Sequence, residues 1–507
     1  MSRKIQTALI SVYHKDGLEE ILQELNRLQV KFISTGGTHD FITSLGYECE
    51  TVEDVSGYPS ILGGRVKTLH PKIFGGILYR REVEADRKQV KAYDIPSIDL
   101  VIVDLYPFEE TVAAGGSEEE IIEKIDIGGI SLIRGAAKNY KDVLIVASKE
   151  QYTPLLELLK EKNGSSDIQD RRQFATSAFK VSSGYDSAIF SYFDNENNSA
   201  LRVSLNEAKH LRYGENPHQK GTFYGNFDEI FEQLHGKEIS YNNLLDIDAA
   251  VSLISDFDET ALAILKHNNA CGMACRPTVK ESWDAALSAD PVSAFGGIVV
   301  TNRTVDKEAA EAINSIFFEV IIAPGYDKDA LEILFQKKNR IILILKSTEK
   351  ATQKLQYRSA LNGALVQDKN DSVQTSGDIQ VVTDKKPTEN EIKDLLFANL
   401  LVKHTKSNAI VLAKNRQLIA SGTGQTSRVD ALKQAIEKAE TFNFDLNGAV
   451  MASDAFFPFP DCVEIAHNAG ITSVIQPGGS IRDAESIDFC NKNGLSMVTT
   501  GTRHFKH

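Results

Sequence analysis

Apolar and polar positions in the first part of the chain follow a pattern that predicts strands separated by helices. Apolar runs at residues 7–13, 99–105 and 143–147 predict buried strands. Residues 17–28 and 131–139 repeat apolar side chains at helical spacing. Uninterrupted apolar strands that alternate with helices are typical of a parallel sheet covered by helices on both faces. We therefore predict an α/β fold with a parallel sheet for this region.

A polar, turn-prone run at residues 194–199 separates this region from the rest of the chain. We place the domain boundary there, which gives one domain at residues 1–195 and a second at residues 200–507. The second domain again mixes strands and helices. Two short stretches in it, starting at Asp290 and Ser453, each place an acidic residue and a Phe beside an apolar strand. This repetition hints at two related halves.

Composition and charge narrow the classes of function. Of the 507 residues, 42% are hydrophobic and 25% charged, which is ordinary for a globular protein. The formal net charge of -14 argues against nonspecific nucleic-acid binding, which depends on basic patches. No apolar run approaches the length of a membrane span, and the N-terminus lacks the apolar segment of a secretory signal. We expect a cytoplasmic protein that binds neither nucleic acid nor membranes.

The cysteines predict reduced thiols and no metal site. They are Cys49, Cys271, Cys275, Cys462 and Cys490. An odd, scattered set of this kind is typical of a reducing compartment. The spacing of Cys271 and Cys275 could suggest a metal ligand pair, but no second Cys or His pair follows at zinc-site spacing.

The stretch Lys266-His267-Asn268-Asn269 directly follows an apolar run that predicts a strand. Ligands in α/β sheets bind beyond the carboxyl ends of strands. A Lys beside a His at such a place can take a proton from a weak nucleophile and stabilise developing negative charge. The alternative is a surface Lys beside a hydrogen-bonded His, and the pair alone does not decide between them.

Loops of the first domain carry groups that suit anion binding and proton transfer. Thr35-Gly36-Gly37-Thr38 opens a predicted helix, where free backbone N–H groups attract anions. Tyr106 closes an apolar strand, and Asp126 precedes a helix that contains Lys138. A phenol, a carboxylate and amines suit proton transfer during a ring closure with loss of water. Each of these residues alone also fits a cap, a turn or a solvated face.

Three stretches of the second domain are rich in polar and turn-forming residues. Arg212 and Tyr213 lie in the first, and Arg428 ends a Gly/Ser/Thr loop suited to an anion. The chain ends in the basic and aromatic residues 503–507. Such a terminus is usually frayed, but directly after a predicted strand at residues 496–499 it could lie inside a site.

Together, the motifs resemble the bifunctional family AICAR transformylase/IMP cyclohydrolase, and the resemblance covers essentially the whole chain. In the first half they are GGRVKTLHP (63–71), LYPF (105–108), DIGG (126–129) and AAKN (136–139). In the second half they are LRYGENPHQ (211–219), KHNN (266–269), SAFGG (293–297), IAPG (322–325), SDAFFPF (453–459) and the basic C-terminus. The occurrence of all of them in this order is highly specific.

The resemblance implies the last two steps of IMP synthesis. The second domain would transfer a formyl group from 10-formyltetrahydrofolate to AICAR, and the first would close formyl-AICAR to IMP. It implies a methylglyoxal-synthase-like first domain, followed by two cytidine-deaminase-like units without the deaminase zinc. The family forms homodimers with the transformylase site at the interface. A structural monovalent cation known from the family has no readable motif here.

The resemblance also assigns roles to residues. His267 would be the general base that deprotonates the AICAR amine. Lys266 would stabilise the oxyanion or help protonate the departing folate nitrogen, and Asn408 would orient the carboxamide. Proton transfer in ring closure would fall to Lys67, Tyr106, Asp126 and Lys138. Nucleotide binding in the first domain would fall to Ser11, Lys15, Thr35, Gly36, Gly37, Thr38, Arg65 and Thr68. Substrate binding in the second would fall to Arg212, Tyr213, Gly296, Glu319, Arg428, Phe456, Arg503, Phe505 and His507.

Three positions depart from the pattern that the resemblance leads us to expect. Ala270 replaces a Pro after the Lys–His pair, Asp104 replaces an Asn before Tyr106, and Glu319 replaces an Asp. A carboxylate at position 104 could change the charge balance around Tyr106. Two alternatives remain open: a nucleotide-binding sensor without turnover, and a protein with one active and one inactive site.

Overall fold

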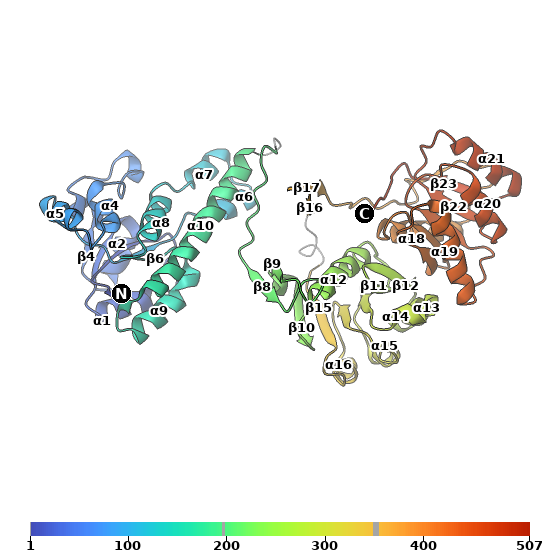
Figure 1. Ribbon diagram of the computed structural model, residues 1–507, viewed down its shortest axis with the longest axis horizontal. Coiled ribbons are helices and arrows are strands. Elements are labelled where there is room, and N and C mark those ends of the chain that lie inside the picture. The colour runs from blue at the N-terminus through green and yellow to red at the C-terminus, as the bar shows by residue number, and fades with distance from the viewer. Residues whose placement is uncertain (1, 195–197, 348–353) are drawn as a thin grey trace. The chain divides into compact units, whose positions relative to one another are not determined.

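A computed structural model describes residues 2–194, 198–347 and 354–507 of the chain (Figure 1). The chain folds into two compact units, Met1–Asn206 and Glu207–His507. The predicted boundary run at residues 194–199 includes residues 195–197, which lie outside the described residues. None of the described helices is both long enough and apolar enough to cross a membrane.

The first unit contains the predicted parallel sheet. Its strands, in spatial order, are β4 (Cys49–Thr51), β3 (Lys31–Ser34), β2 (Thr7–Ser11), β5 (Leu100–Val103) and β6 (Leu144–Val146). All neighbouring strands in this sheet run parallel. Because successive side chains of a strand point to opposite faces, Ala8 and Ile10 pack on one face and Leu9 on the other.

Helices cover both faces of this sheet. Helices α1 (Leu18–Arg27) and α9 (Tyr152–Glu161) bury their apolar sides on one face. Helices α4 (Pro71–Leu78), α8 (Gly128–Lys138) and α10 (Ile168–Asp194) cover the other, where α8 and α10 lie side by side (Figure 1). The other α-helices described in this unit are α2 (Gly36–Ser44), α3 (Val52–Ser56), α5 (Glu84–Ala92), α6 (Phe108–Ala113) and α7 (Glu118–Glu123).

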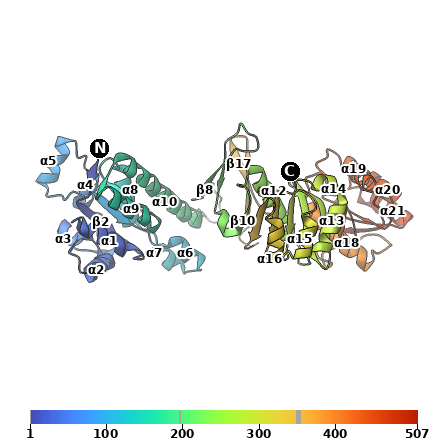
Figure 2. The same ribbon diagram turned by 90° about the horizontal axis from the view of Figure 1, so that it is seen from below.

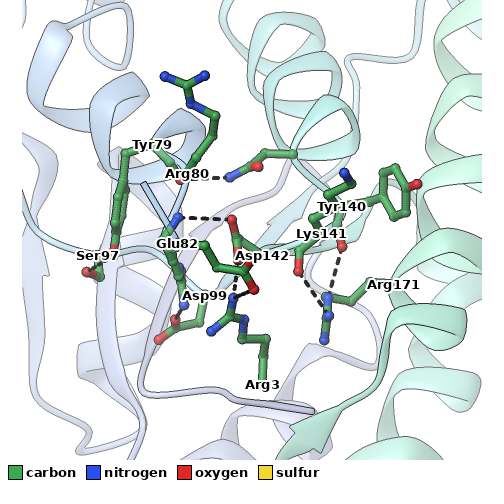
Figure 3. A network of polar contacts seen from close by, with 12 residues as sticks. Arg3, Tyr79, Arg80, Glu82, Ser97, Asp99, Tyr140, Lys141, Asp142 and Arg171 are labelled. Carbon is green, nitrogen blue, oxygen red and sulfur yellow. Dashed lines mark hydrogen bonds and ion pairs between the residues drawn. The ribbon is translucent and has the colours of Figure 1, made fainter. Parts of the chain in front are cut away.

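Charged side chains hold the edge of this sheet where β5 and β6 begin (Figure 3). Asp99, just before β5, accepts hydrogen bonds from the backbone nitrogen of Thr7 at 2.9 Å and from the side chain of Arg81. Asp142, just before β6, pairs with Arg3 at 2.7 Å. These contacts satisfy buried carboxylates that would otherwise destabilise the fold.

Arg171 of α10 anchors the same edge although it is almost fully buried. Its guanidinium donates to the carbonyl oxygens of Tyr140 at 2.9 Å and Lys141 at 3.0 Å (Figure 3). It also donates to the hydroxyl of Ser166 at 3.1 Å. The long helix α10 is thereby tied to the turn that leads into β6.

The second unit is built on a mixed sheet of two similarly ordered halves. The first half contains β11 (Ala261–Lys266), β12 (Asn269–Cys275), β13 (Ile298–Thr301), β14 (Val320–Ala323) and β15 (Ile341–Leu345). The second contains β19 (Ile410–Lys414), β20 (Gln417–Gly422), β21 (Val450–Ser453), β22 (Ser473–Gln476) and β23 (Ser496–Thr499). In each half, an antiparallel hairpin leads into three parallel strands. The halves join where Ala274 of β12 pairs with Gln417 of β20.

The repetition lies in the strand order, and the two stretches that suggested it do not occupy equivalent places. Asp290 precedes β13, whereas Ser453 ends β21 and Asp454 follows it. Strands β10 (Phe231–His235) and β18 (Gln380–Val381) extend the sheet at its two ends. That the two halves are cytidine-deaminase-like units stays a prediction.

Helices cover both faces of this second sheet. Helices α12 (Tyr241–Ile254) and α18 (Glu389–Lys403) share one apolar cluster that spans both halves. On the other face, the first half is covered by α13 (Val279–Ala289), α15 (Lys307–Ile313) and α16 (Lys328–Leu334), which Figure 2 shows gathered together. The second half is covered there by α19 (Arg428–Thr441), α20 (Asp461–Asn468) and α21 (Asp483–Asn493).

Two hairpins stand outside this sheet. One pairs β8 (Ala208–Leu211) with β9 (Gly221–Tyr224), and the other pairs β16 (Leu355–Ala360) with β17 (Gly363–Asp368). Nearly all residues of the β16–β17 hairpin are exposed. Leu355, Tyr357 and Val366 lie on its same face, since Tyr357 pairs with Val366 and side chains alternate along each strand.

Candidate active sites

A cavity of about 630 Å³ lies at the carboxyl ends of β2, β3 and β5 in the first unit. Loops far apart in the sequence meet there because the parallel strands end at the same edge. Its lining includes the predicted residues Ser11, Lys15, Thr35, Gly36, Gly37, Thr38, Arg65, Lys67, Thr68, Tyr106 and Asp126. Lys138 is not among the lining residues; its side chain is exposed in the last turn of α8.

The start of α2 forms one side of this cavity. Gly36 has a positive φ of 43°, and a Cβ built there would lie 3.4 Å from the Lys67 amine. A Cβ on Gly64 would lie 2.9 Å from Cε of Lys67, so glycine at both positions leaves room for this side chain. Lys67 makes no hydrogen bond or ion pair with the residues that the structure describes. An unpaired amine beside a helix N-terminus suits an anionic group.

Two other predicted cations of the cavity already have protein partners. The Lys15 amine donates to the carbonyl oxygens of Val12 at 2.8 Å and Tyr13 at 2.9 Å. Arg65 forms an ion pair with Glu123 across the cavity rim. Lys15 therefore shapes the loop after β2, and Glu123 engages one nitrogen of the Arg65 guanidinium.

Burial changes the proton affinity of Asp126 and Tyr106. Burial raises the pKa of Asp126, and hydrogen bonds from the backbone of Gly129 and Tyr106 oppose that rise. Burial also raises the pKa of Tyr106, and the nearby charge of Asp126 adds to the effect. The Gly129 nitrogen donates to Asp126 at 2.6 Å, and a Cβ at Gly129 would lie only 2.5 Å from the carboxylate. At neutral pH the phenol keeps its proton and can act as an acid.

The cavity neighbours that were not predicted as site residues include Tyr13, Asp104 and Lys124. The Tyr13 ring meets the Tyr106 ring edge-on at 5.5 Å, and the Lys124 amine lies 5.4 Å from the Tyr13 ring centre. Asp104 accepts hydrogen bonds from the backbone of Tyr13 and from the His14 ring. Its charge also contributes to the raised pKa of Tyr106, in line with the effect expected of a carboxylate at position 104.

In the second unit, Lys266 and His267 lie where β11 turns into β12. His267 and Asn268 have positive φ values of 50° and 65°, which makes a tight turn. The Lys266 amine donates to the carbonyl oxygen of Phe295 at 2.8 Å, and the Asn268 nitrogen donates to Asp246 at 2.6 Å. The His267 side chain is exposed. The dyad therefore stands at the tight turn of the β11–β12 hairpin.

A polar cluster lies beside this turn and contains three predicted residues. The Arg428 guanidinium donates to Asn408 Oδ1 at 2.9 Å, to Asp454 Oδ1 at 2.8 Å and to the Phe456 carbonyl at 3.4 Å. Asp454 is fully buried. The amide of Asn408 is thus oriented by the protein before any ligand binds.

Backbone contacts connect the cluster to the dyad and to the chain terminus. Asn269 accepts a hydrogen bond from the Lys406 nitrogen at 3.0 Å, which links the β11–β12 turn to the segment before β19. Ser407 donates to the Lys506 carbonyl at 2.9 Å, which brings the C-terminal tail to the same segment. On the tail, the Arg503 guanidinium lies 4.4 Å from the ring centre of the exposed Phe505.

Four further predicted residues, Gly296, Glu319, Arg212 and Tyr213, lie elsewhere in the second unit. Gly296 follows Phe295, the acceptor of the Lys266 amine, while Glu319 forms an ion pair with Lys237. Arg212 and Tyr213 contact each other in the loop between β8 and β9. Within the described residues, no hydrogen bond or ion pair joins these two to Asn408 or Arg428. The described residues also contain no group of three or more His, Cys, Asp or Glu suited to a metal ion.

Comparisons with known proteins match the whole chain. A family model described as AICARFT/IMPCHase bienzyme matches residues 136–438, and a model of the MGS-like domain matches residues 17–131. A bifunctional purine biosynthesis protein PurH from Bacteroides thetaiotaomicron is 67% identical over 506 residues, covering 100% of this chain and 99% of the relative. Proteins with the same name from Persephonella marina and Aquifex aeolicus are 47% and 46% identical and cover 100% and 99% of this chain, each along its full length.

Proposed function

The chain belongs to the AICARFT/IMPCHase bienzyme family, and we propose that its two compact units divide that family's two reactions. The protein is a bifunctional enzyme of purine biosynthesis that transfers a formyl group to AICAR and cyclises the product to IMP. Ring closure belongs to the unit with the MGS-like fold, and formyl transfer to the unit with the double sheet. The observation that carries this division is that Lys67, Tyr106 and Asp126 converge in one cavity of the first unit.

In ring closure, the carboxamide nitrogen of formyl-AICAR attacks the formyl carbon. Asp126 accepts a proton from that nitrogen, and Tyr106 donates one to the formyl oxygen. A second proton transfer then releases this oxygen as water. Lys67 supplies positive charge in the cavity, and the start of α2 binds the phosphate. Lys138 remains a predicted participant, although its side chain lies outside the cavity lining.

In formyl transfer, the AICAR amine attacks the formyl carbon of a folate, which we propose is 10-formyltetrahydrofolate. His267 accepts the amine proton, and Lys266 stabilises the oxyanion or protonates the departing folate nitrogen. Asn408 orients the substrate carboxamide. This assignment is supported by the exposed position of His267 and by the hydrogen bonds that connect its turn to the segment before β19.

We further propose that the protein is a homodimer with the transformylase site at the interface. Two observations support a second copy. A lone two-stranded hairpin is marginally stable in water, yet the β16–β17 hairpin exposes the apolar side chains of Leu355, Tyr357 and Val366. Arg212 and Tyr213, which would bind AICAR, lack polar contacts with the cluster at Arg428 among the described residues. A partner chain would cover the hairpin and supply these two residues.

The five thiols support a reducing, cytoplasmic location, since none of them is in a disulfide and four are buried. Burial raises the pKa of the four buried thiols, so they stay protonated and unreactive at neutral pH. They therefore take no part in the proposed chemistry.

The test is an assay of the purified protein with AICAR and 10-formyltetrahydrofolate, in parallel with formyl-AICAR alone. We expect IMP from both mixtures, identified by absorbance and chromatography. Accumulation of formyl-AICAR would mean an inactive cyclohydrolase. Binding of IMP without turnover of either mixture would favour a nucleotide sensor and contradict the proposal.

A further inference from the structure

Residues of the C-terminal tail alternate between buried and exposed side chains. His504 is 1% exposed and Lys506 is partly buried, whereas Arg503, Phe505 and His507 are exposed. An extended backbone places successive side chains on opposite faces. The tail therefore has an inner face formed by His504 and Lys506. Its outer face carries the three residues that would bind AICAR.

The His504 ring is held at both nitrogens by amide side chains. Nε2 lies 2.9 Å from Oε1 of Gln374, and Nδ1 lies 3.0 Å from Nδ2 of Asn370. A carbonyl oxygen only accepts and an amide nitrogen only donates, so the imidazole is neutral with its proton on Nε2. Burial agrees with this, because it lowers the pKa of His504 to about 4. Gln374 is fixed in turn by Asn399, whose amide donates to the same oxygen at 2.9 Å.

Backbone bonds fasten the inner face to the loops that carry the polar cluster. The His504 nitrogen donates to the carbonyl oxygen of Asp454 at 2.9 Å. The Lys506 nitrogen donates to the Ser407 hydroxyl at 3.0 Å, and the Lys506 amine donates to the His404 carbonyl at 2.9 Å. The tail thus lies between the segment before β19 and the loop after β21.

We propose that His504 is a positioning residue for formyl transfer, which fixes where the outer face of the tail meets AICAR. This inference rests on the proposed function, because it assumes that Arg503 and Phe505 contact the substrate. His504 faces away from the substrate and acts through the tail backbone. Gln374 and Asn370 belong to the segment between β17 and β18, so the ring ties the tail to a second part of the chain.

The test compares His504→Leu with His504→Gln. Leucine fills the space but leaves the Asn370 amide without its ring acceptor and removes one of the two hydrogen bonds that Gln374 Oε1 accepts, whereas glutamine keeps an N–H near the position of Nε2. We expect His504→Leu to raise the KM for AICAR about 10-fold with little change in kcat, and His504→Gln to raise it less. His467→Gln is the matched control, because this partly buried histidine of α20 packs on Phe489 and makes no hydrogen bond to the tail within the described part of the chain.

Two readouts separate positioning from a general loss of structure. The KM for the folate and the rate of ring closure should stay unchanged in His504→Leu. Nitrogen-15 spectra of histidine-labelled protein should show a neutral ring with its proton on Nε2, which disappears in His504→Gln. A parental KM for AICAR in His504→Leu, or a charged His504 ring at pH 7, would overturn the inference, and the spectrum decides even if His504→Leu does not fold.

Arg503→Ala distinguishes failure of this inference from failure of the proposed function. If Arg503→Ala raises the KM for AICAR while His504→Leu does not, only the positioning role is wrong. If Arg503→Ala leaves that KM unchanged, the tail does not bind AICAR, and the site assignment under the proposed function fails with it.

Discussion

The surroundings of buried Asp126 and exposed Tyr106 suit the base and acid roles that we propose for them. Burial raises the pKa of both groups, but from very different starting values. The phenol therefore stays protonated at neutral pH, while the carboxylate becomes a stronger base than an exposed aspartate. The backbone nitrogen of Gly129 limits the rise by donating to the carboxylate at 2.6 Å. A side chain at position 129 would remove this arrangement.

The low-pH side of the pH–rate profile of ring closure tests this environment. Asp126 must be ionised to accept a proton, so the rate should rise with pH through its folded-state pKa. Because burial raises that pKa, we expect this rise to lie above the value of about 4 found for an exposed aspartate. The measurement is the pH dependence of kcat for formyl-AICAR cyclisation. Asp126→Asn should lose about 100-fold in rate, and an unchanged rate would contradict the role.

At the scale of elements, function depends on where strands and helices end. The cavity of the first unit combines the ends of β2, β3 and β5 with the starts of α2 and α8. The opposite edge of the same sheet is held by buried charges, and Arg171 is the least exposed of them. One edge of the sheet thus carries the cavity that we propose for ring closure, while the other supports the fold.

Arg171→Met tests the supporting edge. Methionine retains much of the volume but leaves the carbonyl oxygens of Tyr140 and Lys141 without their donor. We expect a loss of about 3 kcal/mol in the free energy of unfolding of the first unit. Arg172→Met is the control, since this neighbour is exposed and should change stability by less than about 0.5 kcal/mol. Denaturant unfolding followed through ring-closure activity measures the difference, and equal stability of the two variants would refute the role.

The sequence predicted the strands of the first unit closely because they are buried on both faces. The apolar run at residues 99–105 corresponds to β5 at Leu100–Val103, and its polar ends make the contacts that fix the strand. The pairing of Asp104 with His14 left no local signal, because the partners are 90 residues apart in the sequence. The position of Lys138 also left no local signal in the sequence. The resemblance assigned Lys138 to the site, but α8 places it about 15 Å along the helix from Gly128, which lines the cavity.

The Lys–His pair of the second unit also shows what the local sequence pattern did not reveal. The apolar run predicted the end of β11, but the turn contains His267 and Asn268 rather than the usual Asn-Gly of a tight hairpin. The strand β12 that follows was therefore missed, and Ala270 lies inside it, paired with Leu265. The departure at position 270 therefore falls in a paired strand rather than in a loop.

At the scale of the whole molecule, the account requires a second copy of the chain. Tyr357→Asp and Val366→Asp place charge on the apolar face of the β16–β17 hairpin and should weaken association. Light scattering should show a mass near the 55.9 kDa of one chain instead of twice that value. Formyl transfer should fall with dimer content, while ring closure continues. Gln356→Asp, on the opposite face, is the control, and a dimer that survives the apolar-face variants would refute the proposed interface.

The claim on which everything else depends is that each unit performs one reaction with its own residues. Its most direct test measures both reactions in two variants, His267→Ala and Tyr106→Phe. The account predicts that His267→Ala loses about 100-fold or more in formyl transfer and keeps ring closure, and that Tyr106→Phe shows the reverse. Formyl transfer at the parental rate in His267→Ala, or equal losses of both reactions in either variant, would contradict it.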